Sequence, residues 1–183
     1  MKKIYTLAAF LFLFAINTQS QDFRKPDKSP MDMAYYPDNF AHDRKAGDQP
    51  LIRVTYSRPS KSEREVFGKL VPYGKVWRTG ANEATEIKFY ADATIGGKKV
   101  KAGTYTLFTI PGEKEWTIIL STDLDYWGAY SYNQKNDVLR VTAPVEKASS
   151  VIEDFSIQFS KSGTGAIMHF AWDDTVVSVP IKW

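Results

Sequence analysis

The sequence contains no cysteine and only two histidines, and these absences exclude several kinds of site. Without cysteine the chain can form no disulfide, no thiolate metal site and no thiol nucleophile. A site built from several histidines is not expected, because His42 lies in a charged loop and His169 lies on an alternating strand. We therefore predict no metal site and no cofactor.

The familiar catalytic motifs are also missing. The sequence has no Gly-x-Ser-x-Gly elbow, no His-Glu-x-x-His pair, no phosphate-binding glycine loop and no dinucleotide fingerprint. Asp123-Leu-Asp125 has the start of a calcium loop but lacks the further ligands, so a turn is the better interpretation. The sequence thus names no reaction and no catalytic residue.

Only one long apolar run occurs, and it lies at the N-terminus. Ile4 to Ile16 is apolar except for one threonine, follows two lysines, and is too short to span a bilayer. Small residues at positions 18 and 20 precede a cleavage point between Ser20 and Gln21, as in secretory signal peptides. We predict a signal peptide over residues 1–20, no membrane span, and a protein released into the periplasm or the extracellular space.

Basic and acidic residues occur in nearly equal numbers. The chain has 24 basic and 21 acidic residues, and removal of Lys2 and Lys3 leaves 22 basic residues and a net charge of +1. This balance predicts binding neither to nucleic acid nor to an anionic membrane. The charge is uneven along the chain, because residues 57–83 include six cations and three anions.

What the sequence does contain is a long series of short β patterns. Leu51 to Ser57 alternates apolar and polar residues with the period of two that a half-buried strand requires. Further strands are expected at residues 85–91, 93–95, 98–100, 104–110, 116–120, 138–143, 155–159, 166–172 and 175–183. About nine short strands separated by turn residues predict an all-β fold, an antiparallel β-sandwich that is jelly-roll-like or immunoglobulin-like, with a closed barrel as the alternative.

The chain divides into three parts. After the signal peptide, residues 21–50 are rich in Pro, Asp, Lys and Asn and predict an irregular leader, in which Met31 to Tyr36 could dock as a short edge strand. Residues 51–183 form the single β domain. Its one long ordered loop is expected to hold a short helical turn at Ser62 to Phe67, with Gly68 as the stop.

The segment from Leu70 to Glu83 is chemically richer than a connecting loop needs to be. Arginine recognises carboxylate, phosphate or sulfate with two parallel hydrogen bonds, and tyrosine and tryptophan offer flat apolar faces. Gly74 and Gly80 permit close backbone approach. We predict a site for a small anionic or sugar-like ligand built from Arg58, Tyr73, Trp77, Arg78, Thr79, Asn82 and Glu83, with Trp127 and Tyr130 on the opposite wall.

Two other interpretations of the same residues remain open. Arg78 and Glu83 could form a buried ion pair while Trp77 and Trp127 fill the end of the sandwich, which would make the chain a structural or partner-binding envelope module. Glu83 is also the one good general acid or base of the segment, so a glycan-directed hydrolase is the third hypothesis. Such an enzyme needs a second carboxyl group, which the sequence does not select.

Several runs of the sequence are similar to the signature of a bacterial envelope family known as domain of unknown function 2911. They are Val54-Thr-Tyr-Ser-Arg-Pro-Ser60, Arg64-Glu-Val-Phe-Gly68, Leu70 to Thr85, Lys101-Ala-Gly-Thr-Tyr-Thr-Leu-Phe-Thr-Ile-Pro-Gly112 and Trp127-Gly-Ala-Tyr-Ser-Tyr132. The resemblance covers roughly Leu51 to Trp183 and implies a small secreted β protein, but it transfers no activity and no site residue. The charged leader is longer than the resemblance leads one to expect, and the helical-repeat segment of some relatives does not follow the last strand.

Overall fold

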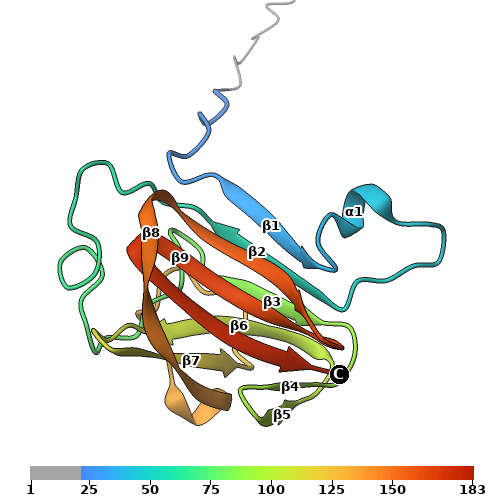
Figure 1. Cartoon of the computed structure of the whole chain (residues 1–183). Coiled ribbons are helices and arrows are strands. Elements are labelled where there is room, and N and C mark those ends of the chain that lie inside the picture. Colours follow the sequence, from blue (N-terminus) through green and yellow to red (C-terminus); the bar gives the residue numbers. More distant parts are fainter. Residues whose placement is uncertain (1–21) are drawn as a thin grey trace, which may run out of the picture.

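The computed structural model describes residues 22–183, so the predicted signal peptide lies outside the described residues. Nine strands form one antiparallel sheet in the order β1-β2-β3-β6-β7-β8-β9-β4-β5, which confirms the all-β prediction (Figure 1). The strands are β1 (Met31–Tyr36), β2 (Ile52–Ser57), β3 (Glu86–Phe89), β4 (Ala93–Ile95), β5 (Lys98–Val100), β6 (Gly103–Ile110), β7 (Glu115–Ser121), β8 (Asp137–Ser162) and β9 (Gly165–Lys182).

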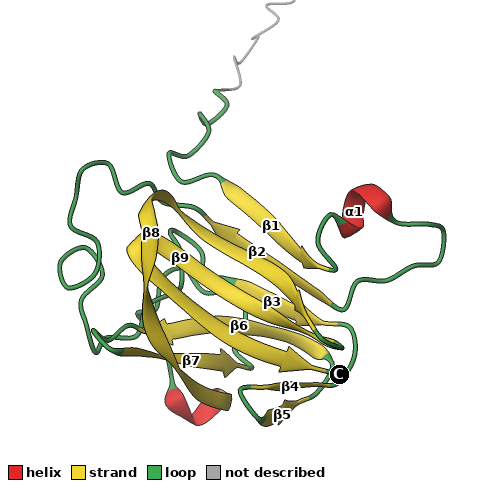
Figure 2. Cartoon of the chain, viewed as in Figure 1, coloured by secondary structure: helices red, strands yellow, loops and turns green. Residues whose placement is uncertain are grey.

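Helical structure is confined to two short pieces of the described chain, α1 (Phe40–Asp43) and the 3-10 turn η1 (Gln134–Asn136) (Figure 2). The prediction of a helical turn at residues 62–67 is wrong, because the structure has no helix there. Ser62 and Glu63 have φ angles of 49° and 62°, in the left-handed region, and the Ser62 amide donates to Glu153 Oε1 at 2.7 Å. A contact with β8, rather than a helical turn, therefore holds this part of the loop. Between residues 22 and 183 no helix is long and apolar enough to cross a bilayer.

The long strand β8 joins the two halves of the sheet. Its first part pairs with β7 and its second part pairs with β9, with irregular register between Lys147 and Ser156. The sheet bends there, so that β8 and β9 pass over the strands of the other half (Figure 1). Rings from the two halves meet between the layers, as between Tyr56 of β2 and Phe155 of β8 at 5.8 Å. This arrangement is compatible with the predicted sandwich.

Two pairs of expected strands are single long strands in the structure. The segments 138–143 and 155–159 both belong to β8, and 166–172 and 175–183 both belong to β9. Residues 144–154 and 173–174 lay outside the expected strands, but there β8 and β9 continue to pair with each other through irregular register. The period of two holds as expected on each side of the irregular stretch of β9, because Met168 and Phe170 are buried before it and Val177, Val179 and Ile181 are buried after it.

The sheet begins inside the segment that was expected to be an irregular leader. β1 pairs with β2 over six residues at the edge of the sheet, as residues 31–36 were expected to do. Tyr36 extends this contact to the other half of the fold, because its ring stacks on Trp183 at 5.2 Å and its hydroxyl donates to Gly165 O at 2.9 Å. The segment 31–36 is thus packed against both halves of the sheet.

Candidate functional site

The connection between β2 and β3, residues 58–85, is irregular but firmly attached to the sheet. Trp77 and Thr109 of β6 exchange two backbone hydrogen bonds, of 2.7 and 3.0 Å. The Thr85 amide donates to Arg78 O at 3.1 Å, and the Thr85 hydroxyl donates to Thr79 O at 2.6 Å. These bonds fix the backbone on both sides of Arg78.

Trp77 belongs to the core. It is 7% exposed and lies in a cluster of rings, 5.0 Å from Phe155 and 6.0 Å from Trp172, in both cases measured between ring centroids. Its Nε1–H donates to Gly80 O at 3.1 Å. Trp77 therefore fills the space between the layers, as the structural interpretation held, and also closes the turn that carries Arg78.

Thr79 is fully buried and has a φ angle of 56°. Its hydroxyl lies 3.1 Å from Thr109 Oγ1 and 3.4 Å from Trp77 O, so its polar group is used within the fold. Arg78 is consequently held between two buried neighbours. Trp77 and Thr79 act as positioning residues for the arginine.

A cavity of about 390 Å³ opens beside Arg78. Its lining includes three cations and no carboxylate, which favours a negatively charged occupant. The lining residues are Ser29, Pro59, Arg64, Leu70, Val71, Pro72, Lys75, Val76, Trp77, Arg78, Gly80, Ala81, Asn82 and Trp172. We call this the Arg78 cavity.

The Arg78 guanidinium is half-buried and has no counter-ion among residues 22–183. Its Nε is buried and makes no hydrogen bond, and no carboxylate of residues 22–183 forms an ion pair with it. Burial lowers the pKa of Arg78, while the nearby Tyr130 acts in the opposite direction. A buried charge without a partner costs free energy, and an anion in the cavity would offset that cost.

The ion pair considered between Arg78 and Glu83 does not form in the described structure, and Glu83 is exposed. Glu83 instead pairs through its backbone with Trp127. Its carboxyl group shares a second cavity, of about 300 Å³, with Glu86 and Asp125. The acidic residues thus line a different cavity from the three cations.

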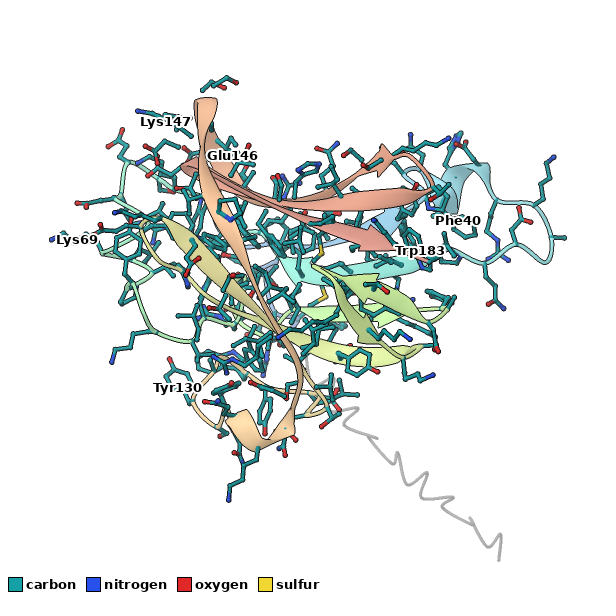
Figure 3. All side chains as sticks on the ribbon, turned by 60° about the horizontal axis from the view of Figure 1, so that its bottom comes forward. Phe40, Lys69, Tyr130, Glu146, Lys147 and Trp183 are labelled. Carbon is teal, nitrogen blue, oxygen red and sulfur yellow. The ribbon has the colours of Figure 1, made fainter. Side chains whose placement is uncertain are left out.

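Trp127 and Tyr130 are brought next to the predicted segment by the loop that follows β7. The Gly128 amide donates to Asn82 O at 2.9 Å, and the Ala84 amide donates to Tyr126 O at 2.8 Å. Tyr130 lies at the opposite end of the molecule from Phe40 and Trp183 (Figure 3). Of the predicted residues, the structure therefore brings together Trp77, Arg78, Thr79, Asn82 and Glu83 with the loop that carries Trp127 and Tyr130.

Arg58 and Tyr73 lie outside the Arg78 cavity. The Arg58 guanidinium is occupied by Asp32 Oδ2 at 3.0 Å, Phe155 O at 3.1 Å and Ser156 Oγ at 2.8 Å. Arg58 lines a larger cavity, of about 600 Å³, between β1 and β8, but its charge is already paired there. Tyr73 is partly exposed and its ring packs against Gly68, where an added Cβ would lie 2.9 Å from Cε2.

Four polar or aromatic residues of the Arg78 cavity were not selected from the sequence. Arg64 and Lys75 were counted among the local cations but were not chosen as site residues, although the number of cations does point to this loop. Ser29 and Trp172 come from the leader and from β9, and nothing in their local sequence indicates that they meet the loop. A nearby carboxylate also comes from the leader, because the pKa of Asp27 is lowered by the hydrogen bond that the Ser29 amide donates to it at 2.7 Å and, to a smaller degree, by the Asn82 side chain.

Residues 22–183 contain no group of three or more His, Asp or Glu side chains placed to hold a metal ion. His42 is exposed and pairs with Asp43 at 2.6 Å. His169 lies on β9 between Ser160 Oγ at 2.7 Å and Ser178 Oγ at 2.9 Å, and burial lowers its pKa. This is the hydrogen-bonded sheet histidine that the alternation on its strand predicts.

Comparison with known proteins gives one match. No curated protein and no solved structure matches the chain. The model of the family described as "Protein of unknown function (DUF2911)" matches residues 39–181, which is most of the chain and agrees with the resemblance seen in the sequence. The chain belongs to the DUF2911 family.

Proposed function

We propose that this protein binds a small anionic ligand, or the anionic group of a sugar-like ligand, in the Arg78 cavity. The observation that carries the proposal is the half-buried guanidinium whose Nε has no hydrogen-bond partner among residues 22–183, in a cavity to which these residues contribute three cations and no carboxylate. The volume of about 390 Å³ falls in the range of small-molecule sites.

The chemistry of the lining fits a carboxylate, phosphate or sulfate group. Arg78 can donate two parallel hydrogen bonds to two oxygens of such a group, and Lys75 adds an exposed positive charge. Arg64 is held in place by the carbonyls of Lys61 at 2.9 Å and Ser60 at 2.5 Å, so its charge is fixed at the cavity. Val71 and Trp172 supply an apolar wall.

The test is the affinity of the mature protein for inorganic phosphate, sulfate and citrate, measured by calorimetry in wild type and in Arg78→Gln. Loss of a charge-assisted hydrogen-bond pair should weaken binding at least about tenfold, which corresponds to about 1.4 kcal/mol. Arg53→Gln is the matched control, because Arg53 on β2 is also half-buried but does not line the cavity.

Equal weakening in both variants would mean that the anions meet only general surface charge. Binding that is unchanged in Arg78→Gln would place any anion site elsewhere. Either result contradicts the proposal.

The hydrolase hypothesis gains one observation, which is that Glu83 lines the same cavity as Glu86 and Asp125. A glycosidase requires two carboxyl groups on either side of the scissile bond, and the structure supplies candidates for the second. Glu83→Gln should then abolish hydrolysis of a glycan that the wild type cleaves. An absence of turnover by the wild type on a broad glycan panel counts against this candidate.

A further inference from the structure

Trp127 and Tyr130 are large aromatic side chains that folding leaves in water. Trp127 is 63% exposed and Tyr130 is 83% exposed. Their rings stack on each other, with centroids 5.7 Å apart and planes inclined by 19°. An isolated exposed aromatic residue needs no explanation, but two stacked ones form a continuous apolar surface of the kind that binds ligands. We call this pair the aromatic platform.

The aromatic platform stands on a rigid support. Beneath it, Tyr126, Ala129 and Tyr132 pack against the buried residues Phe108 and Ile119. Tyr132 meets Phe108 at 5.2 Å, ring to ring. Gly128 has a φ of 73°, and a Cβ added there would lie 2.6 Å from the Tyr130 ring, so only glycine lets that ring lie against the backbone. Because the backbone that carries the platform is anchored to buried residues, ligand binding should cost little free energy in ordering that backbone.

The aromatic platform is also joined to the Arg78 cavity through the backbone, although neither Trp127 nor Tyr130 lines the cavity. The backbone of Trp127 pairs with Glu83, and the next residue, Gly128, donates to the carbonyl of Asn82, which lines the cavity. Tyr130 is near enough to Arg78 to influence its pKa. Trp127 is therefore next to Glu83 and Tyr130 is near Arg78, while Glu83 and Arg78 themselves line different cavities.

We propose that the ligand is an acidic saccharide, a sugar that carries a carboxylate, sulfate or phosphate group. The anionic group binds Arg78, the apolar C–H face of the sugar ring stacks on the aromatic platform, and sugar hydroxyls donate to the Glu83 carboxylate. This inference rests on the proposed function, because it places the anionic group in the Arg78 cavity. The Glu83 carboxylate favours a sugar over a simple aromatic acid as the ligand, because only the sugar brings hydroxyl donors for an exposed carboxylate.

The experiment compares ligands that share an anionic group but differ in the ring. Glucose 6-phosphate is measured beside inorganic phosphate, and glucuronate beside acetate, by calorimetry and by tryptophan fluorescence. In the wild type each sugar should bind about tenfold more tightly than its ringless counterpart. In Trp127→Ala this ratio should fall to about two, and Trp127→Phe should keep most of the ratio. In Arg78→Gln both members of each pair should weaken together.

The outcomes separate this inference from the proposed function. If inorganic phosphate binds through Arg78 but the sugar ring adds nothing, or Trp127→Ala leaves the ratio unchanged, the saccharide inference is wrong and the proposed function stands. If neither the sugars nor the ringless anions bind, the proposed function itself fails. Tighter binding of adenosine 5′-monophosphate than of either sugar would overturn the saccharide assignment in favour of a stacked base.

Discussion

Replacing Trp77 by alanine should lower the free energy of unfolding by about 3–5 kcal/mol, as is usual for a buried aromatic side chain. Trp77 is 7% exposed and contacts Phe67, Trp116, Phe155 and Trp172. The substitution leaves a cavity between the two layers and removes the Nε1–H bond to Gly80 O. Urea unfolding followed by circular dichroism measures the loss.

Trp127→Ala is the matched control for that experiment. Trp127 also belongs to the predicted site, but it is 63% exposed and packs mainly on Tyr130. Its removal should change the free energy of unfolding by no more than about 0.5 kcal/mol. If Trp77→Ala and Trp127→Ala lowered the free energy of unfolding equally, the assignment of Trp77 to the core and of Trp127 to the ligand-binding surface would be wrong.

Gly80→Ala should lower the free energy of unfolding by about 2–3 kcal/mol. A Cβ on Gly80 would lie 2.9 Å from Ser57 O and 3.2 Å from Thr85 Oγ1, and Ser57 O belongs to a strand backbone that cannot easily move. Gly80 must shift instead, which disturbs the turn that holds Arg78. The same urea experiment measures the loss, and affinity for inorganic phosphate should fall with it.

Gly74→Ala separates this steric effect from backbone strain. Gly74 has a φ of 71°, but no atom lies within 4 Å of an added Cβ. The expected loss is about 1 kcal/mol, which is the cost of a left-handed conformation in a residue with a side chain. A loss at Gly74 equal to that at Gly80 would show that crowding against Ser57 is not the cause.

The sequence predicts the sheet well because burial on one face of a strand imposes a period of two that local patterns report. It predicts the lengths of β8 and β9 poorly, because irregular pairing carries both strands through stretches without that period. The leader shows the same limit. Its composition indicates irregular structure, yet β1 is stabilised by pairing with β2 and by the contact of Tyr36 with Trp183, which lies far away in the sequence.

The candidate site, too, could be predicted from the sequence only in part. The density of cations and aromatics between residues 57 and 83 points to the right loop, and the Arg78 cavity is built largely from it. Residue type does not reveal which arginine lacks a counter-ion. Arg58 finds Asp32 of β1 across the fold, whereas Arg78 finds no carboxylate among residues 22–183. That difference depends on tertiary contacts that no local pattern contains.

The central claim is that Arg78 is the group that receives the anion, and the NMR signal of its Nε–H tests this most directly. That atom is buried and has no hydrogen-bond partner in the fold. The signal, assigned through its loss in Arg78→Lys, should shift and saturate as inorganic phosphate or glucuronate is added, because the anion forms charge-assisted hydrogen bonds with the same guanidinium group. A signal that stays in place while either anion binds would contradict the account.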